Sequence, residues 1–175
     1  FHGGGWVLGN LNTHDSMCRR IAKHSRCVVV SVDYEPAPEN PFPGPLDQCY
    51  RATEAVAAQA SRLKIDASKI AVVGDSAGGN LAAAVCLKSR DESGPTIALQ
   101  VLIYPVIEPN FETTSYHYFA DGFGLTRANM QWFWEQYLGT QTKTHLAIPS
   151  IAESLSGLPQ AHIITAQYDV LREEG

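Results

Sequence analysis

Residues 70–84 have the sequence IAVVGDSAGGNLAAA, in which a glycine-rich turn joins two hydrophobic patterns. A short apolar run ends at Val73, and a segment that is small and apolar nearly all round follows, as expected for a strand and then a buried helix. The turn between them matches G-x-S-x-G. A serine there is held in a strained conformation that exposes its hydroxyl at the end of the sheet. Ser76 is therefore a candidate nucleophile, and the N–H of Ala77 is a candidate donor to an oxyanion. The alternative is a glycine-rich turn with an incidental serine.

Strand-like and helix-like segments alternate on both sides of this turn. This order predicts one α/β domain with a mostly parallel sheet and helices on both faces. The predicted strands are 27–34, 69–74, 97–106 and 161–168. The predicted helices are about 13–25, 46–63, 76–88 and a segment around 130–138 that ends at Gly139. Residues 108–159 interrupt the alternation and are rich in aromatic side chains, so we expect a cap or insertion there. An ordinary helical excursion and a lid over a site both fit this segment.

A second glycine cluster, FHGGGWVLGN, occupies residues 1–10. Such a loop turns its backbone N–H groups inward, and HGGG-type loops supply oxyanion donors in esterases and lipases. His2 fits better as an organiser of the loop than as a base. The spacing also loosely resembles a dinucleotide-binding fingerprint with Asp33 as the ribose-binding acid, so an NAD-dependent oxidoreductase is an alternative. It departs from G-x-G-x-x-G, however, and leaves the Ser76 turn unexplained.

Composition excludes several classes of function. The chain has 175 residues and a formal net charge of −5, which gives no basic surface for nucleic acid. No apolar run is long enough to span a bilayer. The four cysteines form no C-x-x-C pair, which favours reduced thiols and a cytoplasmic protein. We expect no metal and no organic cofactor.

Several segments, in order, resemble the hormone-sensitive-lipase-like family of α/β hydrolases, the bacterial family IV esterases. They are HGGGWVLG, HDSMCRRIA, CVVVSVDY, VVGDSAGGNLAAAV, LIYPV, ADGFGLT and YDVLREEG. The resemblance implies a serine carboxylesterase that acts through an acyl-enzyme on short- to medium-chain esters. It implies Ser76 as nucleophile, Asp169 as the acid of the triad, and Gly4 and Gly5 with Ala77 as the oxyanion hole. Glu35 and Pro36 depart from the family's usual Tyr-Arg-Leu-Ala-Pro, in which they stand in place of the arginine and the leucine.

Three further expectations concern substrate, partners and histidine. Trp6 is a candidate substrate-binding residue or, equally, part of the core. A small-molecule ester is the expected partner, and a homo-oligomer of the full-length parent is left open. All six histidines precede Asp169, whereas the triad order is Ser, Asp, His. The catalytic histidine is therefore expected beyond Gly175.

We accordingly expect 1–175 to be a partial α/β-hydrolase domain, truncated at both ends, with its N-terminal cap and its histidine-bearing C-terminal segment outside it. Such a piece alone is expected to expose sheet edges, to fold poorly and to hydrolyse esters negligibly. A non-catalytic ligand-binding relative, like the plant gibberellin receptors, is the alternative, because the missing histidine separates the two.

Overall fold

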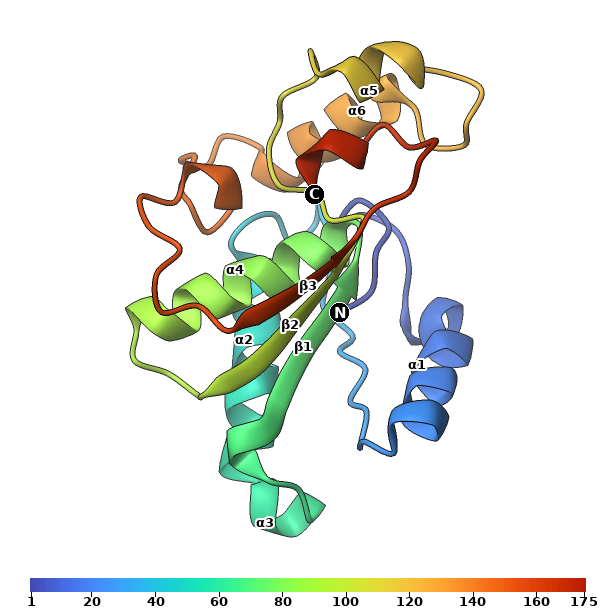
Figure 1. Ribbon diagram of the computed structural model, residues 1–175. Helices are drawn as coiled ribbons and strands as arrows, with labels where there is room; N and C mark the ends of the chain where they lie inside the picture. The colour runs from blue at the N-terminus through green and yellow to red at the C-terminus, as the bar shows by residue number, and fades with distance from the viewer.

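The computed structural model describes residues 1–175, and its centre is a three-stranded parallel sheet (Figure 1). The strands lie in the order β1 (Ile70–Asp75), β2 (Ile97–Ile103) and β3 (Gln160–Ile164). The register pairs the last residue of each strand with the last residue of its neighbour. The loops that follow the three strands therefore meet at one edge of the sheet, where open α/β sheets bind their ligands.

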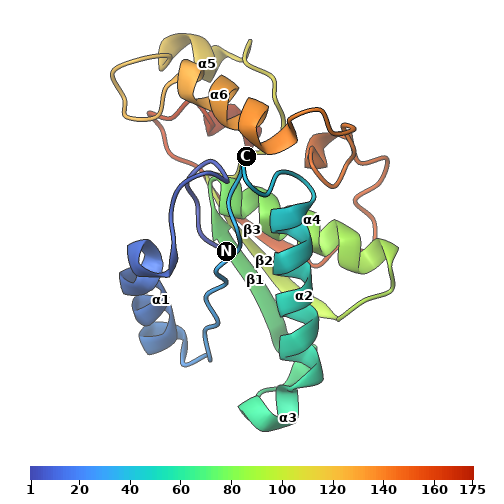
Figure 2. The same cartoon turned by 180° about the vertical axis from the view of Figure 1, so that it is seen from behind.

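Helices cover one face of this sheet. α4 (Ala77–Asp91) contacts β1 and β2, and α2 (Gly44–Ala58) contacts α4 on the same side (Figures 1 and 2). The remaining helical elements are α1 (Leu11–Ser25), α3 (Ala60–Leu63), α5 (Thr114–Tyr118), α6 (Arg127–Leu138) and three 3-10 turns, η1 (Ala67–Lys69), η2 (Pro149–Ile151) and η3 (Arg172–Glu174). In Figure 1, α5, α6 and η3 lie above the carboxyl ends of the strands. No helix combines the length and the apolar character that crossing a membrane requires.

α4 is buried along most of its length because its side chains are small and apolar on nearly every face. Residues 77–87 are all buried, which fits the prediction of a buried helix after the Gly74–Gly78 turn. The helix begins at Ala77, one residue later than predicted, because Ser76 has a left-handed φ and stands as the N-cap.

A cluster of aromatic rings connects the N-terminal loop to α6. The ring of Trp6 stacks on Tyr137 with centroids 4.2 Å apart and lies 4.7 Å from the ring of Trp134. These rings carry large apolar surfaces, so their burial stabilises the position of the loop against α6. α6 ends at Leu138 with Gly139 as its C-cap, as predicted.

The prediction of a strand at 27–34 is wrong. This segment has no regular secondary structure, and Val28 and Val30 are 57% and 48% exposed. β-branched residues favour a strand only where a neighbouring strand pairs with their backbone groups. Here β1 is an edge strand, and a groove of about 570 Å³ separates its free edge from residues 27–32.

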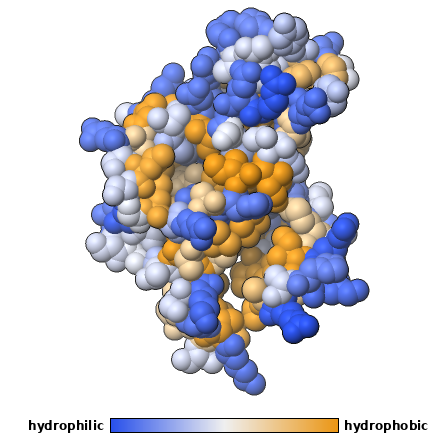
Figure 3. Space-filling view, in the orientation of Figure 1, coloured by the Kyte–Doolittle hydropathy of each residue, from blue (hydrophilic) through white to orange (hydrophobic).

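Several other predicted elements have different bounds in the structure. The predicted helix 46–63 is divided at Gln59 into α2 and α3. The strands predicted to reach residues 106 and 168 end at Ile103 and Ile164. β3 is exposed throughout, with Ile163 and Ile164 46% and 42% accessible, and Figure 3 shows apolar residues gathered over the strands on this face.

Candidate active site

The turn between β1 and α4 holds Ser76 in a strained conformation, with φ 54° and ψ −119°. Its N–H donates to the carbonyl of Ile103 over 2.8 Å, and its own carbonyl accepts from Asn80 and Val106. A Cβ on Gly74 would stand 2.0 Å from the carbonyl oxygen of Gly78, so the chain can turn this tightly only with glycine there. Positive φ is rare for a residue with a side chain and marks functional sites. The G-x-S-x-G motif therefore has the backbone geometry expected of it.

The HGGG loop lies beside this turn. The Phe1 amino group donates to the Val73 carbonyl over 2.7 Å, which places the start of the loop along the end of β1. Gly4 has φ +117°, a conformation that a side chain would strain. The N–H groups of Gly4 and Gly5 donate to no acceptor of the protein. The N–H of Ala77, in the first turn of α4, has no partner within its helix. Three unpaired donors therefore belong to the two segments around Ser76.

His2 organises the loop, as predicted. Its ring stacks on Tyr34 with centroids 4.1 Å apart, and its Nδ1 lies 2.9 Å from the Gly3 carbonyl. The Tyr34 hydroxyl donates to the His2 carbonyl over 2.8 Å. Burial lowers the pKa of His2 below its usual value. His2 has no hydrogen bond to Ser76 and is placed to support the loop.

Asp75 and His14 are two residues that the sequence left without a role. The Asp75 carboxylate accepts from the N–H of Gly3 over 3.1 Å, and Nε2 of His14 lies 3.2 Å from the same carboxylate. Asp75 is buried, and the two side chains are 12% and 19% exposed. The one feature of the sequence that indicated a role for Asp75 was its position, because it is the only charged residue in the glycine-rich turn and lies next to the candidate nucleophile.

Asp169 lies in the loop that follows β3. Its Oδ1 accepts from the N–H of Leu171 over 3.0 Å, which is the one hydrogen bond of the Asp169 side chain. Burial raises the pKa of Asp169, and the hydrogen bond from Leu171 opposes this rise. Val170 and Leu171 are fully buried and anchor the loop. The second carboxylate oxygen is free to accept from a further donor.

Glu174, in η3, fastens the loop of Asp169 to the segment after β2. Its Oε2 accepts from the N–H of Ile107 over 2.6 Å and of Glu108 over 3.0 Å, while Oε1 accepts from the Tyr116 hydroxyl over 2.9 Å. The Ser115 hydroxyl also donates to the Val170 carbonyl over 2.7 Å. Burial raises the pKa of Glu174 to about 7. Glu174 is thus directed toward α5 as an anchor.

Gly175 follows η3 as its C-cap. It packs closely against the end of β3, because a Cβ on it would stand 2.5 Å from Cγ2 of Thr165 and 3.3 Å from Cγ2 of Ile163. The catalytic histidine is expected beyond this residue. That expectation stays a prediction, since the structure describes residues 1–175.

The sheet brings the loops of Ser76 and Asp169 to the same edge. Ser76 follows β1 and Asp169 follows β3, two strand spacings or ~10 Å across the sheet. Burial raises the pKa of Tyr104, which follows β2 between them, and the negative charges of Asp75 and Asp169 raise it further. None of the six histidines hydrogen-bonds to Ser76 or Asp169. Their polar contacts lie elsewhere: His14 with Asp75, His117 with Glu112 and His145 with Asp91.

Two other features lie outside this edge. Trp6 has no exposed surface and belongs to the aromatic core, and its contact with a substrate stays a prediction.

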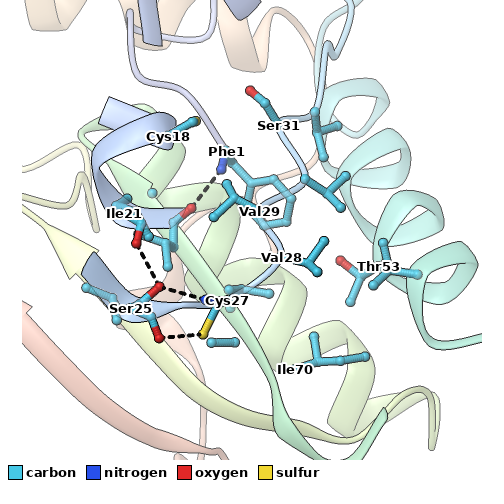
Figure 4. A pocket seen from close by; sticks show the side chains of 18 of the residues that line it. Phe1, Cys18, Ile21, Ser25, Cys27, Val28, Val29, Ser31, Thr53 and Ile70 are labelled. Carbon is cyan, nitrogen blue, oxygen red and sulfur yellow. Dashed lines mark hydrogen bonds between the residues drawn. The ribbon is translucent and has the colours of Figure 1, made fainter. Parts of the chain in front are cut away.

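The 570 Å³ groove is lined by Phe1, α1, residues 25–32, α2 and β1, and Figure 4 labels Phe1, Cys18, Thr53 and Ile70 among its lining residues. It contains neither Ser76 nor Asp169. No group of three or more His, Cys, Asp or Glu side chains is placed to hold a metal ion.

The dinucleotide alternative has no support in this geometry. It would need residues up to Asp33 to form a sheet strand, but this segment is not in the sheet. The Asp75 carboxylate also occupies the N–H of Gly3, where a pyrophosphate would need a free donor.

Comparison with known proteins identifies the family to which the chain belongs. The family model described as alpha/beta hydrolase fold matches residues 1–175, so the chain belongs to that family. It is 43% identical over 183 residues to the carboxylic ester hydrolase LipN and 41% identical over 180 residues to the carboxylesterase NlhH, both of Mycobacterium tuberculosis. A thermostable esterase structure from Pseudomonas putida ECU1011 matches 99% of the chain at 44% identity with a TM-score of 0.96. The resemblance to family IV esterases and the predicted α/β-hydrolase fold are confirmed.

These matches cover 99–100% of this chain but only part of each relative. The alignments include 100% of the chain and 49% of LipN or 56% of NlhH, and the chain covers 56% of the P. putida esterase chain. The chain spans about half the length of the relatives it matches.

Proposed function

We propose that the full-length protein containing this chain is a carboxylic ester hydrolase with Ser76 as its nucleophile. The observation that carries this proposal is the positive φ of Ser76 beside the unpaired N–H groups of the HGGG loop and of Ala77. A strained serine next to preorganised donors is suited to acyl transfer. The names of LipN and NlhH, both ester hydrolases, support the same reaction class.

The reaction would proceed in two halves. Oγ of Ser76 attacks the ester carbonyl carbon while a base takes the hydroxyl proton, and the carbonyl electrons move onto oxygen. The N–H groups of Gly4, Gly5 and Ala77 donate to this oxyanion. Collapse expels the alcohol, which receives the proton from the base, and leaves an acyl-enzyme. Water repeats the sequence, and the acid is released as Ser76 is restored.

The base requires a histidine from outside this chain, beyond Gly175 in the triad order. The six histidines of the chain make other contacts or lie apart from the site, and Asp169 retains a carboxylate oxygen without a partner. An imidazole placed between Ser76 and Asp169 would take the hydroxyl proton, and Asp169 would orient it. We therefore assign Asp169 as the acid of the triad.

The substrate is proposed to be a small-molecule ester with a short to medium acyl chain. Within the segment 108–159, α5 and α6 lie over the carboxyl edge of the sheet, and this segment would form the cap that bounds the acyl site (Figure 1). Hydrolysis by this route needs no cofactor. The cytoplasmic location and a homo-oligomer stay predictions, which fractionation and light scattering would test.

The test is turnover by the full-length gene product. p-Nitrophenyl esters from acetate to dodecanoate should be hydrolysed, with the highest kcat/KM at the short to medium chains. A fluorophosphonate should label Ser76, as peptide mass spectrometry would identify. Ser76→Ala should abolish turnover and labelling, and Ser61→Ala, an exposed serine of α3, should leave both unchanged. A full-length protein that is folded but neither turns over esters nor is labelled would contradict the proposal and favour a ligand-binding relative.

A further inference from the structure

The carboxylate of Asp75 connects the two halves of the proposed site. Asp75 immediately precedes Ser76, and its Oδ1 accepts from the N–H of Gly3, which immediately precedes Gly4 and Gly5. One side chain therefore links the turn of the nucleophile to the loop of the oxyanion donors, across 72 positions of sequence.

His14 holds this carboxylate from α1. Its Nε2 lies 3.2 Å from Oδ1 and 3.3 Å from Oδ2 of Asp75. An ionised carboxylate only accepts hydrogen bonds, so Nε2 carries the proton and donates. The helix places His14 firmly, because Asn10 caps it through the N–H of Thr13 and the Thr13 hydroxyl lies 2.9 Å from Nδ1 of His14. A charge-assisted hydrogen bond with little exposure to water is among the stronger ones.

The other anchors of the loop do not end on the Gly74–Gly78 turn itself. The Phe1 amino group donates to the Val73 carbonyl, one residue before the turn. The His2 carbonyl accepts from the Tyr34 hydroxyl, and the Trp6 carbonyl accepts from the N–H of Ala37 over 2.9 Å. Both of these donors come from the segment 34–37. Asp75 is thus the side chain that ties the loop to the turn of Ser76.

We propose that His14 and Asp75 are a positioning pair that aligns the oxyanion donors with Ser76, an inference that rests on the proposed ester hydrolysis. Neither side chain contacts the ester. His14 holds the Asp75 carboxylate, which holds the N–H of Gly3 and so the direction of the next two N–H groups. These donors act on charge that exists only in the transition state, so their misalignment lowers kcat and leaves KM nearly unchanged.

The test compares variants of the full-length protein with p-nitrophenyl butyrate. His14→Leu should lower kcat about tenfold with KM within about twofold of wild type, less than the 10²–10³ that loss of a whole donor costs. His14→Gln should restore most of the loss, because its side-chain N–H can donate where Nε2 does. Asp75→Ala should lower kcat about 100-fold. His24→Leu, an exposed histidine of the same helix, is the matched control and should behave as wild type.

A second readout separates alignment from general stability. The affinity for a trifluoromethyl ketone, which forms an oxyanion on Ser76, should fall in His14→Leu by the same factor as kcat, while urea unfolding midpoints of His14→Leu and His14→Gln stay alike. An active wild type with unchanged kcat in His14→Leu, or a His14→Gln no better than His14→Leu, would overturn this inference alone. An inactive wild type would overturn the proposed function together with it.

Discussion

Replacing Glu174 with glutamine is expected to remove a pH dependence from the stability of the protein. Burial raises the pKa of this carboxyl group from 4.5 to about 7, although two backbone N–H groups and the Tyr116 hydroxyl donate to it. Each pKa unit corresponds to ~1.4 kcal/mol, so the folded state disfavours the ionised form by roughly 3 kcal/mol.

The sign follows from proton binding. Between pH 4.5 and about 7 the folded protein keeps a proton on Glu174 that the unfolded chain has released. The contribution of Glu174 to stability is therefore complete below pH 4.5 and is lost as the pH rises to about 7. Glu174→Gln cannot ionise, and its amide can still accept from the N–H of Ile107 and donate toward Tyr116. The variant should thus gain stability relative to wild type as the pH rises, by up to roughly 3 kcal/mol at pH 8.

The assay is urea unfolding of the full-length protein and its variants at pH 5, 6, 7 and 8. The quantity of interest is the difference in unfolding free energy between Glu174→Gln and wild type, because other titrating groups then cancel. Glu173→Gln removes an exposed neighbour that pairs with Arg172 and serves as the control. If Glu174→Gln and wild type gave parallel profiles from pH 5 to 8, the reasoning about burial would be refuted.

Three further predictions concern the full-length protein. Asp169→Asn should lower kcat by about 10³–10⁴, because the amide cannot stabilise the imidazolium of the base; a fall of less than tenfold in steady-state assays would remove Asp169 from the triad. Gly4→Ala should lower kcat at least 100-fold, since the residue has φ +117° and the added Cβ would lie 2.2 Å from the Leu8 carbonyl oxygen; near-normal kcat would exclude Gly4 as a donor. Trp6→Ala should lower the unfolding free energy by about 3–5 kcal/mol, because Trp6 is fully buried against Tyr137; a loss below 1 kcal/mol in urea would contradict its core position.

The features that were predicted best are those that depend on residues close together in the sequence. The strand ending near Asp75, the helix after Ser76 and the glycine loop each follow from a local pattern. The 27–34 strand failed because pairing depends on a distant partner, and β1 does not supply one to this segment. The pair of Asp75 and His14 could not be predicted for the same reason, because the two residues are 61 positions apart in the sequence.

Two carboxylates with little exposure, the buried Asp75 and the half-buried Glu174, accept hydrogen bonds from the loops at the carboxyl edge of this sheet. Loops at the carboxyl edge lie beyond the hydrogen bonds that join the strands, so their backbone N–H groups need other acceptors. Asp75 accepts from Gly3, and Glu174 accepts from Ile107 and Glu108, so each loop is tied to a neighbouring element. A carboxylate suits this task because its two oxygens accept several donors at once, whereas a hydroxyl would satisfy fewer. The cost is desolvation, which is evident in the raised pKa of Glu174 and makes the anchor of the Asp169 loop the pH-sensitive part of the scaffold.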